Sequence, residues 1–198
     1  MNTNTLIDLK PFCLTGPSRT ALAKPFTRDG FTYATDGRMA VRVEARENEP
    51  GDEKALDAAK LFEPELAKPH TEHAWPVVPE PVTKICGKCD GRGKFSKCAD
   101  CDGDGVQVCD LDHEHECERC GGSGQLPGND SACITCNGTG HEDEVQTVRV
   151  AHTAFSDKYL RLALTLPDAK LHLADDPMAP ALITFAGGVA LLMPVRIK

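Results

Sequence analysis

Eight of the ten cysteines lie in four copies of one pattern, Cys-x-x-Cys-x-Gly-x-Gly, between Cys86 and Gly140. The copies read CGKCDGRG, CADCDGDG, CERCGGSG and CITCNGTG, and they begin at Cys86, Cys98, Cys117 and Cys133. Two cysteines three positions apart on a tight turn can direct both sulfur atoms at one ion, and zinc takes four such ligands in a tetrahedron. Thiolates also suit zinc better than magnesium or calcium. The four copies therefore predict two structural zinc ions, each bound by the cysteines of two copies.

The glycines after each cysteine pair allow backbone angles that other residues avoid, so that N–H groups can turn toward the thiolates. A redox or disulfide role is the alternative for CxxC pairs, but it needs only one or two pairs and leaves four matched copies unexplained. Iron–sulfur clusters also use four cysteines, although with a different, non-repeated spacing. The repeat therefore favours zinc over both alternatives.

Four further residues with metal-binding side chains lie in or beside the repeats: Cys109, His113, His115 and His141. The spacing of Cys109, His113 and His115 allows a third metal site. The segment is also rich in Asp and Glu, which is typical of a solvated loop, and we favour the loop. Cys13, far from the repeats, is interpreted as a small buried apolar residue rather than a nucleophile.

Composition fits a metal-stabilised middle segment. Residues 83–144 contain one aromatic residue, Phe95, so this segment has little with which to form an apolar core. Metal coordination has to replace hydrophobic burial there. From Cys86 to Gly140 there are five Lys or Arg and ten Asp or Glu, which gives −5, and each zinc ion with four thiolates adds −2. Such a surface predicts a protein partner with a basic surface.

The whole chain is also acidic, with a formal charge of −8, which argues against an open basic surface for unspecific binding of nucleic acid. The N-terminus lacks the pattern of a targeting segment. No apolar stretch approaches the roughly 20 residues that span a bilayer. We therefore expect no membrane association and a cytoplasmic location, where thiols stay reduced and ten cysteines indicate metal binding.

The segments on either side predict the elements that carry the cysteine repeats. Residues 31–43 place Asp36-Gly37 between two β-prone runs, which predicts a hairpin, and residues 26–31 add a strand before it. Residues 52–66 are rich in Ala, Leu, Glu and Lys and predict a short helix. Five prolines between Pro64 and Pro81 then predict an extended linker into the cysteine repeats.

The C-terminal segment predicts one helix among strands. A strand is expected over 145–151 and a helix over 157–166, capped by Ser156 and stopped by Pro167. Three strands follow, over 170–174, 181–185 and 189–197. The predicted order is β-α-β-β-β, and we expect the N-terminal segment to be a degenerate copy of it, with a helix over 5–14 that Pro11 weakens.

The four repeats resemble the cysteine-rich region of the DnaJ co-chaperones over about a quarter of the chain. In that family the first repeat pairs with the fourth and the second with the third. The resemblance thus implies one site of Cys86, Cys89, Cys133 and Cys136, and another of Cys98, Cys101, Cys117 and Cys120. A nested hairpin would allow this pairing without crossing the chain, and a sequential pairing is the alternative. No His-Pro-Asp triplet and no Gly/Phe-rich linker occur, so the resemblance implies no J-domain.

The flanks resemble one domain of the bacterial sliding clamp, the β subunit of DNA polymerase III. Tyr33–Val43 (YATDGRMAVRV) is similar to a clamp segment, although the clamp's histidine is absent. Residues 155–166 and the ending LLMPVRI at 191–197 are similar to further clamp segments. The resemblance implies an α+β fold: one discontinuous clamp-like domain over 1–82 and 145–198, with an elongated, hairpin-type double zinc module inserted over 83–144.

Clamps bind DNA through basic helices that line a ring. The resemblance implies such a role for Lys158 and Arg161, with Lys10 and Arg19, whereas ordinary solvated helix surface is the competing interpretation, which we favour. A single domain could encircle DNA only as a homo-oligomer, and the sequence leaves the oligomeric state open. Nucleic acid would then be bound by the clamp-like domain alone.

Three functions are compatible with these observations. The first is a non-catalytic accessory protein of DNA replication or repair, of a size that suits a phage or another mobile element. The second is a co-chaperone-like zinc module that binds proteins without a J-domain. The third is an enzyme, which we do not favour because the chain shows neither a catalytic triad nor a phosphate-binding loop. Four cysteines also close each zinc site, which indicates structural metal.

Overall fold

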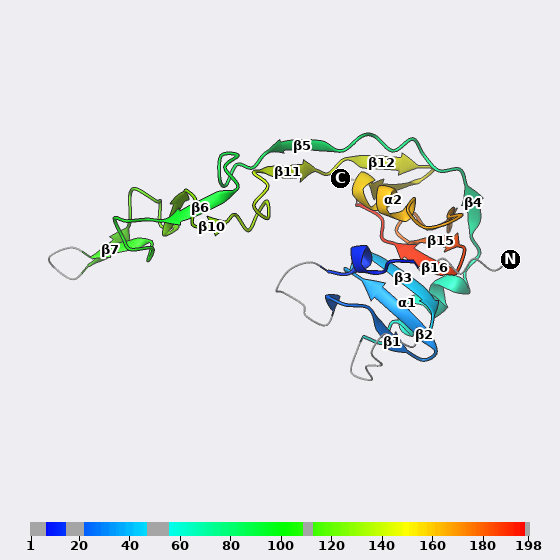
Figure 1. Ribbon diagram of the computed structural model, residues 1–198. Coiled ribbons are helices and arrows are strands. Elements are labelled where there is room, and N and C mark those ends of the chain that lie inside the picture. The colour runs from blue at the N-terminus through cyan, green and yellow to red at the C-terminus, as the bar shows by residue number, and fades with distance from the viewer. Residues whose placement is uncertain (1–6, 15–21, 47–55, 109–112, 197–198) are drawn as a thin grey trace. The chain divides into compact units, whose positions relative to one another are not determined.

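The computed structural model describes residues 7–14, 22–46, 56–108 and 113–196. The chain forms two compact units (Figure 1). Unit 1 contains residues 1–80 and 145–198, and unit 2 contains residues 81–144. Each unit has its own sheets and its own buried residues.

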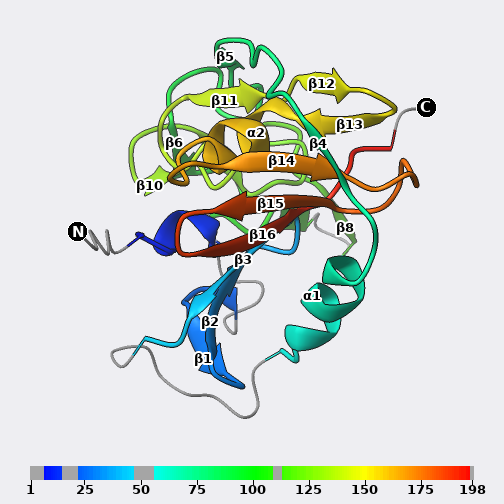
Figure 2. The same ribbon diagram turned by 90° about the vertical axis from the view of Figure 1, so that its right-hand side faces the viewer.

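Unit 1 is built on an antiparallel seven-stranded sheet with the order β1-β2-β3-β16-β15-β14-β4 (Figure 2). These strands are β1 (Phe26–Arg28), β2 (Phe31–Thr35), β3 (Met39–Glu44), β4 (Thr71–His73), β14 (Lys170–Leu173), β15 (Ala181–Phe185) and β16 (Gly188–Leu192). Strands from the two ends of the chain meet at the centre, where β3 pairs with β16 from Met39↔Leu192 to Val43↔Gly188. The insertion of unit 2 therefore interrupts the chain but not the sheet.

The central strands alternate between two apolar layers, as the two-residue period of a strand requires. Val41, Ile183 and Leu192 belong to the larger cluster, to which the helix α2 (Asp157–Ala163) contributes Leu160 and Ala163. Tyr33, Leu182 and Leu191 belong to a second cluster, which the helix α1 (Ala59–Leu66) covers with Phe62. The sheet is thus packed on both faces.

Several predicted elements are confirmed. Asp36 and Gly37 form the turn between β2 and β3, where Asp36 Oδ1 accepts the N–H groups of Arg38 and Met39. The Tyr159 hydroxyl of α2 donates to the other oxygen of the Asp36 carboxylate. Strand β1 precedes this hairpin, and β14, β15 and β16 follow α2 as expected. In the described part of the predicted helix over 52–66, α1 begins only at Ala59.

The predicted fold class is wrong. Over the described residues the chain is mostly β, with sixteen strands, two α-helices and one 3₁₀ turn, η1 (Lys10–Phe12). In the described part of the helix predicted over 5–14, only this turn forms, with Pro11 at its start. The strand predicted at 145–151 does not join the main sheet, because β12 (Thr147–Val150) pairs with β13 (Thr153–Ser156) in a separate sheet. The N-terminal and C-terminal parts of unit 1 are therefore not two copies of a β-α-β-β-β unit.

A buried ion pair joins the two places where the chain leaves and re-enters unit 1. The Asp157 side chain is fully buried and lies 2.8 Å from Arg161. Its other oxygen accepts the Gln146 N–H, and the Asp157 N–H donates to the Gln146 carbonyl. Arg161 donates to the backbone carbonyl of Pro79, and the Gln146 side chain donates to the backbone carbonyl of Glu80. Segments 79–80 and 146 are thereby held together by side chains of α2 and its neighbours.

Unit 2 begins and ends in a ribbon of two antiparallel strands, β5 (Val82–Ile85) and β11 (His141–Glu144). The strand β6 (Lys94–Lys97) lies between β9 (Gln125–Pro127) and β10 (Ser131–Ala132). A further hairpin joins β7 (Val106–Val108) to β8 (Glu114–Glu116). These short ladders alternate with the four cysteine repeats along the chain (Figure 1).

We expect Asp157→Ala to destabilise unit 1, because it leaves the Gln146 N–H and part of the Arg161 guanidinium without their acceptor. Loss of such a partner costs about 1–3 kcal/mol. Burial raises the pKa of Asp157, but Arg161 and the backbone N–H groups of Gln146 and Lys158 outweigh it and hold the pKa below its usual value. The stabilisation is therefore present above the unfolded pKa and is lost as the pH falls through the folded pKa.

Denaturant unfolding at neutral and acidic pH, followed by the fluorescence of Trp75 in unit 1, the one tryptophan of the chain, measures this effect. Asp175→Ala is the matched control, since Asp175 is exposed. Equal unfolding free energies for the two variants at pH 7 would contradict the role of the ion pair.

Candidate metal centre

Each repeat folds into the same tight turn because its fifth, sixth and eighth residues have positive φ. In the first repeat these are Asp90 at 50°, Gly91 at 78° and Gly93 at 74°. The fifth position is occupied by Asp90, Asp102, Gly121 and Asn137 in the four repeats. Asp, Asn and Gly are the residues that adopt this left-handed conformation at least cost. The sequence of each repeat therefore specifies its backbone.

The first cysteine group joins the first repeat to the fourth. The sulfur atoms of Cys86, Cys89, Cys133 and Cys136 all lie within 4.8 Å of one another. Cys86 and Cys133 are 3.9 Å apart and Cys89 and Cys136 are 3.7 Å apart, measured between Sγ atoms. A zinc ion with Zn–S bonds of about 2.3 Å needs tetrahedral S–S distances of about 3.8 Å. Disulfides need an S–S distance of about 2.05 Å, and these cysteines are free.

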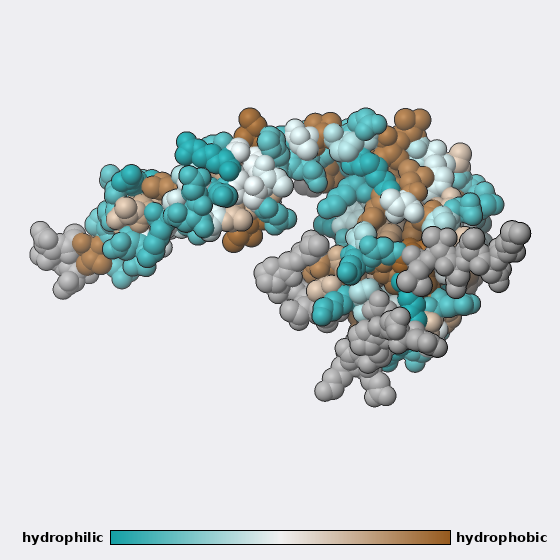
Figure 3. Space-filling model, in the orientation of Figure 1, coloured by the Kyte–Doolittle hydropathy of each residue, from teal (hydrophilic) through white to brown (hydrophobic). Residues whose placement is uncertain are grey.

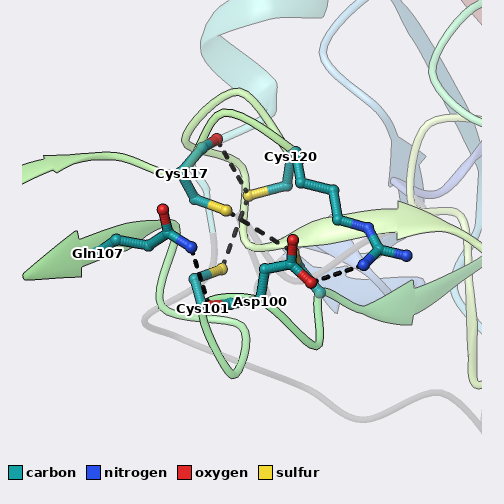
Figure 4. A network of polar contacts seen from close by, with 7 residues as sticks. Asp100, Cys101, Gln107, Cys117 and Cys120 are labelled. Carbon is teal, nitrogen blue, oxygen red and sulfur yellow. Dashed lines mark hydrogen bonds and ion pairs between the residues drawn. The ribbon is translucent and has the colours of Figure 1, made fainter.

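The second group joins the second repeat to the third with the same geometry (Figure 4). Cys98 and Cys117 are 3.9 Å apart, and Cys101 and Cys120 are 3.7 Å apart, again between Sγ atoms. The structure thus pairs the repeats one with four and two with three, and not sequentially. The prediction of two zinc sites is confirmed, in that two separate tetracysteine groups can each hold one ion.

Backbone N–H groups stabilise the second thiolate of every repeat. The Gly93 N–H donates to Cys89 Sγ over 3.2 Å, and Gly140 donates to Cys136 over the same distance. Gly105 and Gly124 donate to Cys101 and Cys120 over 3.3 Å. Such charge-assisted bonds hold the sulfur atoms in place and offset their negative charge.

The eighth-position glycines also join the paired turns. A Cβ atom on Gly93 would lie 2.2 Å from the carbonyl oxygen of Gly138, and one on Gly140 would lie equally close to that of Gly91. The carbonyls of Gly140 and Gly93 accept the N–H groups of Cys86 and Cys133. Gly105 and Gly124 have equivalent contacts in the second site. Each site is therefore a pair of turns related by an approximate twofold axis.

Small apolar contacts and one ion pair complete the sites. Phe95 packs against the first cysteine group and Leu126 against the second. At the second site Arg119 and Asp100, the neighbours of two ligands, form an ion pair of 2.6 Å (Figure 4). The sequence predicts none of these contacts with the cysteine groups, because pairing between turns that are distant in the chain leaves no local pattern.

In the folded geometry, each site combines one thiol with a lowered pKa and one with a raised pKa. Burial raises the pKa of Cys101 and Cys136, but N–H groups of nearby glycines and the neighbouring thiols outweigh it and bring both values to about 7. The Glu142 carboxylate and burial raise the pKa of Cys86 to about 12. Burial and hydrogen bonding to Cys120 raise the pKa of Cys117 to about 11.

The structure also locates the remaining candidate residues. Cys109 lies outside the described residues, whereas His113, His115 and His141 are exposed, and no further metal-binding cluster occurs within the described ranges. Cys13 is buried and its thiol contacts the Leu9 carbonyl. Lys10 and Lys158 are exposed, Arg161 is engaged by Asp157, and Arg19 lies outside the described residues. In the part of the chain that is described, no helix is both long enough and apolar enough to cross a membrane.

Comparisons of the chain with protein-family models, with curated proteins and with solved structures found no match. In each of the two sites, four thiolates lie at tetrahedral distances, and the second thiolate of each repeat accepts a hydrogen bond from a backbone N–H group, which makes both closed zinc-binding sites.

Gly93→Ala is expected to disrupt the first site. Alanine at a left-handed φ costs on the order of 1–3 kcal/mol, and its Cβ would collide with the Gly138 carbonyl. Metal content should fall from two zinc ions per chain to one, as measured by elemental analysis after dialysis. Gly87→Ala is the control, since a Cβ there meets nothing within 4 Å, and it should keep both ions. A Gly93→Ala chain that keeps two tightly bound ions would contradict this geometry.

Zinc affinity should rise with pH. Thiols such as Cys86 and Cys117, with pKa values of about 12 and 11, must lose their protons when zinc binds. The metal-bound thiolates are thus stabilised at high pH and the complex is lost as the pH falls. Competition with a chromogenic chelator should give roughly a tenfold gain in affinity per pH unit for each proton displaced. An affinity that does not change between pH 6 and pH 8 would refute the thiolate ligands.

Proposed function

We propose that the chain is a non-catalytic interaction protein, in which unit 2 is a DnaJ-type zinc module that binds segments of other proteins. The observation that carries the proposal is the closure of both sites by four sulfur atoms each. Catalytic zinc keeps one position open for water or substrate, and closed tetrathiolate sites serve structure. Zinc in unit 2 would therefore maintain a surface rather than perform a reaction. A reducing compartment such as the cytoplasm suits free thiols of this kind.

A cavity of about 500 Å³ in unit 2 offers such a surface. Its wall combines turns of both metal sites with β6 and β9, and its apolar residues include Phe95, Leu126 and Ile134. Ile134 is 86% exposed, and the view of unit 2 in Figure 3 shows separate apolar patches within a hydrophilic surface. The size is that of a pocket for a few side chains of an extended segment.

The charge of the unit indicates the chemistry of the partner. Residues 98–118 contain eight Asp or Glu and no Lys or Arg, and the thiolate-bound zinc ions add negative charge. A partner segment with apolar side chains for the cavity and basic residues beside them would match both features. Complementary charge of this kind increases the rate of association and excludes acidic competitors.

Binding of DNA receives less support. That hypothesis came from the clamp resemblance, which the fold contradicts. Of the basic residues on α2, Arg161 is held by Asp157 and the Pro79 carbonyl, so it is not available to a phosphate. We therefore do not propose a role in DNA metabolism.

The test is suppression of aggregation when a chemically denatured model protein is diluted into zinc-loaded chain, followed by light scattering. The chain should reduce scattering, and Ile134→Asp should lose most of this effect because a carboxylate at the cavity opposes an apolar segment. Val77→Asp is the matched control, since Val77 is 94% exposed and belongs to unit 1. Scattering unchanged by the wild-type chain, or equal effects of the two variants, would overturn the proposal.

A further inference from the structure

The two metal sites share a donor set and a backbone but differ in exposure. All four cysteines of the first site are buried, and none of them is more than 5% exposed. At the second site Cys98, Cys101 and Cys117 are buried, whereas Cys120 is only partly buried. The residue equivalent to Cys120 in the first site is Cys136, the second cysteine of its repeat. Cys120 and Cys136 thus occupy equivalent positions in the two sites but differ in exposure.

The partly buried Cys120 lines the cavity described above. Cys120 is the one metal-ligand cysteine of the described chain that lines it, together with Lys88, Arg119 and Ser123. The cavity is wide enough for a small reagent. Cys120 is therefore the most exposed of the eight metal-ligand cysteines, and it is the one that lies beside this cavity.

We propose that Cys120 is a modification site through which oxidants and electrophiles release zinc from the second site while the first site stays intact. Susceptibility of a cysteine follows its thiolate character and its exposure. Metal coordination gives all eight sulfur atoms thiolate character, so exposure decides between them. The second site then acts as a releasable zinc site within a module that the first site continues to hold.

With hydrogen peroxide as oxidant, the reaction balances in two steps. The Cys120 thiolate attacks peroxide, forming an S–O bond and breaking the O–O bond, and hydroxide leaves. The thiolate of Cys101, whose Sγ lies 3.7 Å from that of Cys120, attacks the resulting sulfenic acid, forms the S–S bond and displaces the second hydroxide. Two thiolates lose two electrons and peroxide gains them, while the Zn–S bonds of Cys101 and Cys120 break and the zinc ion leaves with two ligands lost. With iodoacetamide, the thiolate displaces iodide and becomes a neutral thioether, which is a poor zinc ligand.

The experiment uses the full zinc-loaded chain with Cys109→Ser, so that the buried Cys13 is the one cysteine left outside the two metal groups. Limiting peroxide or iodoacetamide is added, released zinc is read with a chromogenic chelator, and modified cysteines are mapped by mass spectrometry. One equivalent of zinc should leave at least about tenfold faster than the other, with Cys120 modified first. A Cys101–Cys120 disulfide should form with peroxide. Equal release from both sites, or first modification at any other cysteine, would overturn the proposal.

Gly87→Phe tests the route to Cys120. Gly87 lines the same cavity and a Cβ there meets nothing within 4 Å, so a larger side chain starts in open space beside the cavity. After elemental analysis shows two bound zinc ions, modification of Cys120 should slow severalfold while the slow phase from the first site stays unchanged. An unchanged rate at Cys120 would show that the cavity is not the route.

Discussion

The bond between thiolate and metal is the interaction on which unit 2 depends. Its strands are two to four residues long and mostly exposed, and its buried hydrophobic positions, over the described residues, are cysteines. Phe95 and Leu126 each contact one cysteine group but do not form a core between them. A segment of about this size that buries so little apolar surface needs another source of stability. Eight sulfur atoms in two tetrahedral groups supply it.

Unit 1 is stabilised by hydrophobic burial instead, because it has an apolar layer on each face of one sheet. The sheet is continuous although the chain is interrupted between β4 and β12, and the pair β3–β16 lies at its centre. The buried Asp157 and the partly buried Gln146 hold the two ends of the interruption together through hydrogen bonds. Unit 1 therefore does not need metal, and unit 2 does not need to contribute to the sheet.

Sequence predicted most of the metal chemistry because the relevant signal is local. Every repeat carries its ligands, its left-handed residues and its glycines within eight positions, so each turn could be predicted alone. The Asp36-Gly37 hairpin was equally local. The fold class failed because it depended on long-range pairing: no local pattern distinguishes β12, which forms a separate ribbon with β13, from a strand of the main sheet. The partial exposure of Cys120 was also beyond prediction, since it results from how four distant segments surround one cavity.

Hydrogen exchange of the full chain, measured by mass spectrometry before and after removal of zinc by a chelator under reducing conditions, tests the central claim most directly. The account predicts that residues 81–144 lose their protection when zinc is removed, whereas the strands of the main sheet in unit 1 keep theirs. Protection of residues 81–144 that persists in the metal-free, reduced chain would contradict it.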